Sequence, residues 1–533
     1  MALPRTAADL NIDGPMALLT RFPRLCLVLF CLAVFTPGLA TLPPLDRDES
    51  RYAQASKQML ESGDYIEIQF QEEARNKKPV GIYWMQAATA SVLSSAPYTD
   101  IWAYRLPSVI GAICAVLLVF GIGARFYDTQ TGLVAGALMG GSLLMVGEAH
   151  IAKTDAVQLA CIVAAQALIA KFYFAARLGE PQPSFRWSVA LWGALGLAIL
   201  VKGPIGPFIC AVTIVTLSIW ERRWSWIWSM RPIAGLFVVT LIVLPWLLAI
   251  TLVTKGQFLA DAWGRDFAGK VVASQEGHWG VPSYYLRLLP ISFWPGSLFL
   301  VPAAIYAWMT RHESTTRFLV AWLVPVWIFL EFTPTKLPHY VLPLYPALAL
   351  LCAAAVMAAM RESSQVFAHW SVKAAAGIWV LLSLVLVGAL LVYIPSQYGG
   401  GSGVFLYALI LPVLVGAGFA AYFVFREDGE RAVTAALVSG AVLVVAALGA
   451  AVPRLDQLML SPKAAELAAS VGATANHGER LTIAGYTEPS FVFLAGTKAK
   501  LASDGADAAE FMIATANAYA LVERNIEDAK FRK

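Results

Sequence analysis

The sequence predicts an all-α polytopic membrane protein with about thirteen transmembrane helices, interfacial helices at the outer face and a small C-terminal α/β domain. Three observations lead to this fold class. Of the 533 residues, 58% are hydrophobic and only 14% are charged. The mean hydropathy is +0.65, and long apolar runs alternate with short polar connections. This composition excludes a soluble enzyme and a disordered chain, and a formal net charge of +4 is too small to attract nucleic acid in general.

Windows of about 18 apolar residues mark the candidate spans. They are residues 25–42, 101–123, 132–147, 156–175, 187–201, 204–220, 233–253, 286–309, 318–332, 340–360, 374–394, 404–425 and 432–452. The first run ends in Thr41-Leu42-Pro43-Pro44 and lacks a small-residue cleavage site, so we expect a transmembrane helix and not a cleaved signal peptide.

The charges in the connections orient the spans. Arginines occupy alternate connections, at positions 125, 177, 186, 222, 223, 231, 311, 317, 361, 426 and 431. The short connections between them carry only Lys153, Lys202 and Lys336. By the positive-inside rule the arginine-bearing loops and the N-terminus are cytoplasmic. An odd number of spans then places the C-terminal domain on the outer side.

Two long outer loops and a tail follow from this topology. We expect a transmembrane domain at 1–452, with loops 46–96 and 254–285 forming the roof of the site, and a separate domain at 453–533. In the first loop Tyr52, Ala55, Met59 and Leu60 have the spacing of an amphipathic helix lying in the membrane interface. The tail predicts a helix near 462–471, a strand at 481–486 and an apolar segment at 490–495.

The ionisable residues outside the tail concentrate at the predicted outer face. They are Asp46, Asp48, Glu49, Arg51, Lys77, Lys78, Glu148, His150, Lys153, Asp155, Lys202, Arg265, Lys270, Glu276, His278, Glu331, Lys336 and His339. Charges near hydrocarbon are costly unless they are paired or face a cavity. The sequence therefore predicts a polar cavity that opens outward.

The first charged group is Asp48-Glu49-Ser50-Arg51-Tyr52, directly after the first span. On a helix Asp48, Arg51 and Tyr52 share a face, whereas Glu49 points about 100° away. One carboxylate can therefore face the cavity beside a cation. The alternative is ordinary capping, because acids favour the first turn of a helix.

Two further charged groups also have both a structural and a functional interpretation. Lys77-Lys78-Pro79 precedes an aromatic stretch, so these lysines either anchor the chain to lipid headgroups or grip a specific lipid phosphate. Asp155 closes a polar loop that begins at Glu148, and it either caps the fourth span or faces the cavity.

Other site types find little support. The six cysteines lie in apolar runs without metal-ligand spacing, and no phosphate-binding loop or dinucleotide fingerprint is present. His278, with Glu276 nearby, and the distant His339 are weak candidates for a divalent metal site.

Taken in order, five motifs resemble the bacterial aminoarabinose-transferase-like branch of the protein mannosyltransferase superfamily. They are Asp48-Glu49-x-Arg-Tyr, Lys78-Pro79 with Tyr83-Trp84, Lys153-Thr154-Asp155, Lys202-Gly203-Pro204, and Lys336-Leu337-Pro338-His339-Tyr340-Val341-Leu342-Pro343. The stretch from Arg265 to His278 is similar to the outer loop of that branch. Each motif alone is weak, whereas the ordered set spans about residues 46–346.

The resemblance implies an inverting glycosyltransferase of the C-type (GT-C) fold in the bacterial inner membrane, with its C-terminal domain in the periplasm. Its donor would be a sugar on a polyprenyl phosphate such as undecaprenyl phosphate, and its acceptor lipid A, a related glycan or a protein. Asp48 matches the leading catalytic candidate, with Glu49, Arg51 and Tyr52 in support, and Asp155 matches a second acid. Lys78 and Tyr340 match phosphate-site positions. Lys202 and Lys336 are neighbouring cations able to stabilise a leaving phosphate.

One position departs from the family pattern. Aminoarabinose transferases commonly have a glutamate before the phosphate-binding lysine, where it helps an outer-loop histidine to hold a metal ion, and this chain has Lys77. The sugar and a metal cofactor are therefore open. Two other classes also stay open on the sequence alone: a transporter of a polar solute or lipid-linked sugar, and a non-catalytic envelope assembly protein.

Overall fold

The computed structural model describes residues 20–45, 47–262, 280–361, 365–400, 404–473, 480–486 and 488–523. In this part of the chain nine helices are long and apolar enough to cross a membrane, or eleven if each of two bent pairs counts as one span. The nine spans are built on α5 (Ile101–Phe126), α8 (Asp155–Leu178), α9 (Phe185–Lys202), α11 (Pro232–Val253), α16 (Ser314–Phe332), η5 (Pro338–Leu344) with α17 (Tyr345–Arg361), α19 (Trp370–Gly388) with α20 (Ile394–Tyr398), α21 (Val404–Phe425) and α22 (Gly429–Ala446). The helical membrane fold is confirmed.

The remaining predicted spans are bent or short. Helices α6 (Thr129–Gly141) and α7 (Leu143–Ala149) meet at 64°, because Ser142 between them is extended. Helix α14 (Tyr284–Ser292) and the segment η4 (Gly296–Phe299) with α15 (Leu300–Met309) meet at 115° across Pro295, which has no N–H to continue a helix. Helices α2 (Pro23–Phe35) and α10 (Ile205–Trp220) are apolar but shorter. The total of thirteen spans stays a prediction.

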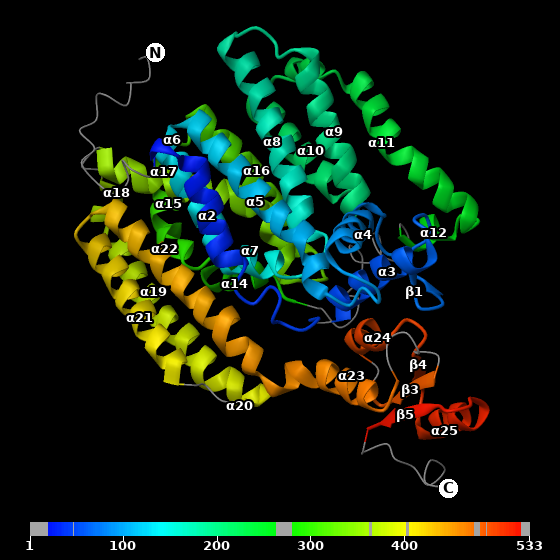
Figure 1. Ribbon diagram of the computed structural model, residues 1–533. Helices are drawn as coiled ribbons and strands as arrows, with labels where there is room; N and C mark the ends of the chain where they lie inside the picture. Colours follow the sequence, from blue (N-terminus) through cyan, green and yellow to red (C-terminus); the bar gives the residue numbers. More distant parts are fainter. Residues whose placement is uncertain are drawn as a thin grey trace.

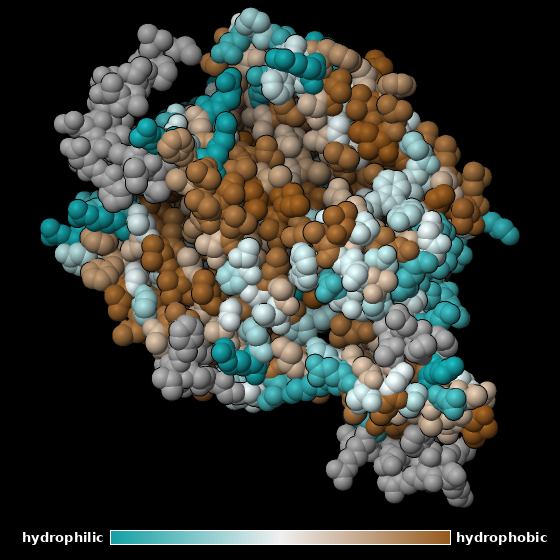
Figure 2. Space-filling model, viewed as in Figure 1, coloured by the Kyte–Doolittle hydropathy of each residue, from teal (hydrophilic) through white to brown (hydrophobic). Residues whose placement is uncertain are grey.

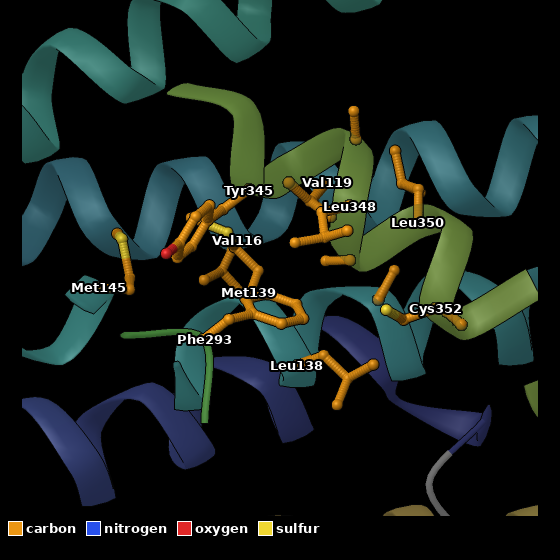
Figure 3. Close-up of a cluster of buried hydrophobic side chains, with 14 of the residues drawn as sticks. Val116, Val119, Leu138, Met139, Met145, Phe293, Tyr345, Leu348, Leu350 and Cys352 are labelled. Carbon is orange, nitrogen blue, oxygen red and sulfur yellow. The ribbon is translucent and has the colours of Figure 1, made fainter. Parts of the chain in front are cut away.

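The interior of the bundle is close-packed around α5. Figure 3 shows Val116 and Val119 of α5 facing side chains of α6 and α17, among them Met139 and Leu348. A Cβ atom added at Gly132 of α6 would lie 2.5 Å from the carbonyl oxygen of Phe120. Close approach through small residues is how helices associate in lipid, where hydrophobic burial supplies little driving force.

The outer surface of the bundle is apolar. Side chains of α11 such as Leu236, Phe237 and Leu241 are mostly exposed. Figure 2 shows brown apolar atoms over the side of the bundle, with teal polar atoms gathered toward its ends. This distribution is the one expected of a lipid-facing wall.

The two ends of the bundle differ in their charges. At one end Glu221 accepts hydrogen bonds from Arg177, in the last turn of α8, and from Arg317 of α16 at 2.9 Å. At the other end of α8, Asp155 pairs with Lys202 at the end of α9. Arginine-bearing and lysine-bearing connections therefore lie at opposite ends, as the topology predicts.

Short elements cover the lysine end. They are α3 (Arg47–Ser62), β1 (Gln69–Phe70) paired antiparallel with β2 (Glu73–Ala74), α4 (Gly81–Leu93) and α12 (Gln257–Leu259). The apolar stripe predicted on α3 faces protein: Tyr52, Ala55 and Met59 are buried against α4 and Trp246 of α11, and Leu60 packs on a separate cluster. The stripe lies away from lipid because α4 lies alongside α3 (Figure 1).

The tail forms a small α/β unit at the same end as α3 and α4 (Figure 1). Its elements are α23 (Leu460–Ser470), β3 (Leu481–Ala484), α24 (Pro489–Ala495), β4 (Lys500–Ala502), α25 (Gly505–Ala514) and β5 (Tyr519–Val522). The sheet has the order β4-β3-β5 with both pairs parallel. The predicted helix and strand are present, and the apolar segment at 490–495 is helical. The domain boundary at 452/453 stays a prediction.

Candidate active site

An open cavity of about 990 Å³ lies at the lysine end, between α8, α10, α16 and η5. Its polar lining includes Lys78, Asp155, Lys202, His339 and Tyr340. Most of the remaining wall is apolar, formed by Ile205, Phe208, Phe329, Leu330, Leu342 and Pro343. Four of the predicted site residues are thus brought together from four separate segments, at the mouth of an apolar groove.

A second open cavity of about 970 Å³ shares two of these residues, Lys78 and Lys202. Lys77 lines it as well, and its apolar walls come from α9, α11 and α12, with Trp246 and Phe258 among them. Two apolar grooves therefore converge on one pair of lysines.

Asp155 lies at the centre of a charged cluster. Its carboxylate accepts a hydrogen bond from Lys202 at 2.5 Å, and it lies 3.8 Å from Lys153 Nζ and 3.9 Å from His339 Nε2. Positive neighbours favour the ionised form of a carboxyl group. Asp155 thus makes charge-assisted contacts with two lysines and is suited to holding them in place.

Glu148 completes this cluster from the last turn of α7. Its Oε1 accepts a hydrogen bond from Lys153 at 3.0 Å and lies 3.9 Å from His339 Nδ1. Burial by itself lowers the pKa of Lys153, but the carboxylates of Glu148, Asp155 and Asp48 outweigh it and raise the pKa. Lys153 is therefore a fixed cation that links the cluster to Asp48.

Asp48 is more accessible than the other carboxylates. Its side chain is 57% exposed, and it lies 3.9 Å from Nη2 of Arg75. Arg75 stacks over the ring of Tyr52, with 5.0 Å between the guanidinium carbon and the ring centroid, and donates a hydrogen bond to Tyr83. The cation beside Asp48 is therefore Arg75, from the β1–β2 hairpin, and not the neighbouring Arg51 that helix geometry favours.

Tyr52 lies within electrostatic range of both Asp48 and Asp155. Burial raises the pKa of its hydroxyl, and the negative charges of Asp48 and Asp155 both add to this shift. Asp48 itself does not contribute to the lining of either cavity described above. Its carboxylate is open to solvent, so a group that approaches this end of the bundle can reach it.

Glu49 points away from the cavity, as helix geometry predicts. Its two oxygens accept hydrogen bonds from Arg105 at 2.8 and 2.9 Å, and from the backbone N–H groups of Leu45 and Ala152. Both side chains are fully buried. Glu49 thus ties the start of α3 to the loop that carries Lys153.

Lys336 is placed differently from Lys78 and Lys202. Its Nζ donates to the carbonyl oxygens of Leu330 and Glu331 at 2.7 and 2.5 Å, and it lies over the ring of Tyr285. These carbonyls belong to the last turn of α16, where carbonyl oxygens lack the usual N–H partners, and that of Leu330 accepts one long hydrogen bond of 3.3 Å from the N–H of Thr333. Lys336 is therefore engaged in capping a helix and does not line either cavity.

The metal candidate His278 lies outside the described residues, as do Arg265, Lys270 and Glu276. Within the described ranges no group of three or more His, Cys, Asp or Glu side chains is arranged to hold a metal ion. Lys77 also brings a cation where the family pattern has a metal-binding glutamate. The described residues therefore do not form a metal site, and no step below uses a metal.

Sequence reasoning missed Arg75 and Arg105. Arg105 had a usable signal, because a charge inside the apolar run 101–123 requires a partner. Arg75 had none, because its place beside Asp48 depends on the turn of the β1–β2 hairpin.

Comparisons with known proteins agree with this architecture. The model of the dolichyl-phosphate-mannose-protein mannosyltransferase family matches residues 20–256. The chain is 29% identical over 431 residues to the undecaprenyl phosphate-α-4-amino-4-deoxy-L-arabinose arabinosyl transferase of Pseudomonas paraeruginosa, covering 78% of this chain and 74% of that protein. It is similar in fold to ArnT from Cupriavidus metallidurans bound to undecaprenyl phosphate, with a TM-score of 0.69, 18% identity, and 96% and 90% of the two chains covered. An oligosaccharyltransferase from Archaeoglobus fulgidus follows, with a TM-score of 0.57, 11% identity, and 89% and 64% covered.

The fold and the site together define an integral-membrane glycosyltransferase of the C-type fold. The chain is similar to the aminoarabinose-transferase-like branch of the protein mannosyltransferase superfamily, which is the family that the five motifs predict.

Proposed function

We propose that the protein transfers a sugar from a polyprenyl-phosphate donor to lipid A or a related envelope glycan, with inversion at the anomeric carbon. The observation that carries this proposal is the convergence of two apolar grooves on Lys78 and Lys202. A polyprenyl phosphate is complementary to this arrangement, because its long apolar chain can lie in a groove and its anionic phosphate can bind the lysines. The names of the relatives support an undecaprenyl phosphate-linked donor.

The orientation follows from the charges of the connections. The arginine end of the bundle is assigned to the cytoplasm and the lysine end to the periplasm. The site, α3, α4 and the C-terminal unit then lie at the periplasmic face of the bacterial inner membrane, and the N-terminus lies in the cytoplasm. This is the face on which lipid A and other envelope glycans are accessible.

In the reaction an acceptor oxygen attacks the anomeric carbon from the side opposite the phosphate. The bond between that carbon and the phosphate oxygen breaks, and the polyprenyl phosphate leaves with the electron pair. Lys78 and Lys202 stabilise the growing negative charge in a site that excludes water on its apolar sides. Asp155 keeps Lys202 in place, and Tyr340 lines the same cavity.

Asp48 is assigned to the acceptor. A hydroxyl acceptor must give up its proton as it attacks, and the exposed carboxylate of Asp48 is available to take it. A phosphate acceptor is already largely an anion near neutral pH. In that case Asp48 balances the positive charge that develops on the sugar.

The test is mass spectrometry of envelope lipids and glycoproteins from a deletion strain that carries the wild-type gene, Asp48→Asn or the control Asp456→Asn. Asp456 is an exposed carboxylate of the tail that pairs with Lys463. We expect one glycosyl increment to be missing from a lipid in the deletion and Asp48→Asn strains only. An increment missing from a glycoprotein would change the acceptor to a protein, and unchanged profiles in both fractions would refute the proposal.

A further inference from the structure

The C-terminal unit inserts one aromatic side chain among the elements that carry the site. Phe493 of α24 is fully buried in a cluster with Ala53 of α3, Ala90 of α4, Tyr104 of α5 and Ala152. We call these five residues the junction cluster. Its rings are in contact, because Phe493 packs edge-to-face on Tyr104 with 5.4 Å between ring centroids.

Two members of the junction cluster lie in segments that hold site residues. Ala53 is on α3, five residues after Asp48, and Ala152 directly precedes Lys153. The backbone N–H of Ala152 also donates to Glu49 at 2.8 Å. The ring of Phe493 therefore packs where the helix bearing Asp48 meets the loop that leads to Asp155.

Polar contacts fix the register of α24 on α3. Lys57, whose side chain is fully buried, donates to the carbonyl oxygen of Phe493 at 3.0 Å and lies 3.7 Å from Glu61. Gln54 donates to the hydroxyl of Thr497 at 2.7 Å, and this hydroxyl donates to Glu61 at 2.6 Å. Gln54, Lys57 and Glu61 lie on one face of α3, at spacings of three and four residues.

A second element holds the same segment. Gln71, at the tip of the β1–β2 hairpin, donates to the carbonyl oxygens of Thr497 and Ala499 at 3.0 and 2.6 Å. This hairpin also carries Arg75, the cation beside Asp48. Both partners of the Asp48–Arg75 pair thus stand on elements that touch the C-terminal unit.

The buried ammonium of Lys57 argues against a purely stabilising role for these contacts. Burial lowers the pKa of Lys57, and Glu61 offsets only part of that shift. Taking a charge out of water costs free energy that an apolar side chain would not. The hydrogen bond from Lys57 to the carbonyl oxygen of Phe493 forms at only one position of α24 on α3, so it specifies how the two helices dock.

We propose that Phe493 is a positioning residue for glycosyl transfer: its ring, docked through Lys57 and Thr497, sets α3 and Asp48 against the Lys153–Asp155 loop. The C-terminal unit then contributes to the geometry of the active site and is not a functionally independent domain. This inference rests on the proposed function, because it assigns the geometry of the same site.

Helix α24 offers a matched control. Phe491, two residues before Phe493, is equally buried but packs in the core of the C-terminal unit with Leu481 and Ile483. Phe491→Leu therefore perturbs the unit itself, whereas Phe493→Leu and Phe493→Ala perturb its docking on α3. The full-length protein is used in each case.

The first measurement is hydrogen exchange of the backbone amides of α3 and of residues 150–154. We expect faster exchange there in Phe493→Ala, an intermediate rate in Phe493→Leu and the wild-type rate in Phe491→Leu. This readout needs no substrate. If exchange responds as expected but the wild-type protein transfers no sugar, then the proposed function fails while the mechanical coupling stands. Unchanged exchange in Phe493→Ala overturns the inference.

The second measurement is steady-state kinetics with a polyprenyl-phosphate sugar. Small displacements of a catalytic group cost up to about a hundredfold in rate, so we expect kcat of Phe493→Ala to fall by about ten- to a hundredfold. The donor KM changes less than kcat, because neither Lys78 nor Lys202 lies on α3 or in residues 150–154. Phe493→Leu restores part of kcat, and Phe491→Leu keeps it. Equal kcat values for Phe491→Leu and Phe493→Leu, or a normal kcat in Phe493→Ala, refute a positioning role.

Discussion

Replacing Glu49 by Gln tests the buried ion pair beneath the site. Arg105 uses all five of its N–H groups, two toward Glu49 and three toward the carbonyl oxygens of Leu39, Leu42 and Pro43. An amide has nearly the shape of the carboxylate but no charge. The guanidinium therefore stays fully buried without its counter-ion.

The magnitude follows from this geometry. Removing one partner of a buried ion pair typically destabilises a protein by about 3–5 kcal/mol, because the other charge is left uncompensated. The control is Glu427→Gln, since Glu427 pairs with Lys373 where both side chains are substantially exposed. An exposed pair of this kind contributes at most about 1 kcal/mol.

The assay is the free energy of unfolding in detergent, measured by denaturant titration for wild type, Glu49→Gln and Glu427→Gln. We expect Glu49→Gln to be less stable than the control by several kcal/mol. A second variant, Glu49→Gln with Arg105→Met, should recover little, because three carbonyls and two backbone N–H groups then lose their charged partners. Equal stability of Glu49→Gln and Glu427→Gln would show that the Glu49–Arg105 ion pair contributes no more to folding than an exposed pair does.

Four further predictions concern the site and the topology. Lys78→Ala removes a charge-assisted contact of about 1.5–3 kcal/mol, so donor affinity in a binding assay should fall by about ten- to a hundredfold; unchanged affinity would return Lys78 to a headgroup anchor. Asp48→Asn keeps a good helix cap but cannot act as a base, so turnover should fall at least about a hundredfold with normal folding, and a near wild-type rate would move the catalytic role to Asp155. Lys336→Gln loses contacts to the end of α16, so it should lower stability by about 1–3 kcal/mol yet leave donor affinity per folded molecule far closer to wild type than Lys78→Ala does; an equal loss of affinity would contradict the capping role. A reporter fused after Phe531 should be periplasmic and one near Arg222 cytoplasmic, and finding both on one side would overturn the topology.

The membrane spans could be predicted from the sequence because hydropathy is a local property. Each predicted run coincides with a helix or a bent helix pair in the structure. The bends were not predicted, because the extended backbone of Ser142 and the interruption at Pro295 depend on packing. In the tail a helix and a strand were predicted, whereas the parallel order of its sheet depends on contacts between distant segments.

In the candidate site, too, the residue types could be predicted from the sequence but the directions of their side chains could not. Lys202 and Lys336 look alike in sequence, since each lies in a proline-containing connection between spans. Lys202 lines both cavities, while Lys336 turns to the carbonyl oxygens at the end of α16. The direction of a long side chain depends on the acceptors within its reach, and those acceptors become neighbours only after folding.

The separation of charges along α8 bears on how the donor reaches the protein. Asp155 begins this helix of 24 residues and Arg177 lies near its end, so the two charged ends stand roughly 33 Å apart. A lipid-linked sugar assembled on the arginine side has a polar head that cannot diffuse unaided through hydrocarbon of that depth. A donor assembled on that side would therefore need a separate catalyst of lipid inversion before it could meet Lys78 and Lys202.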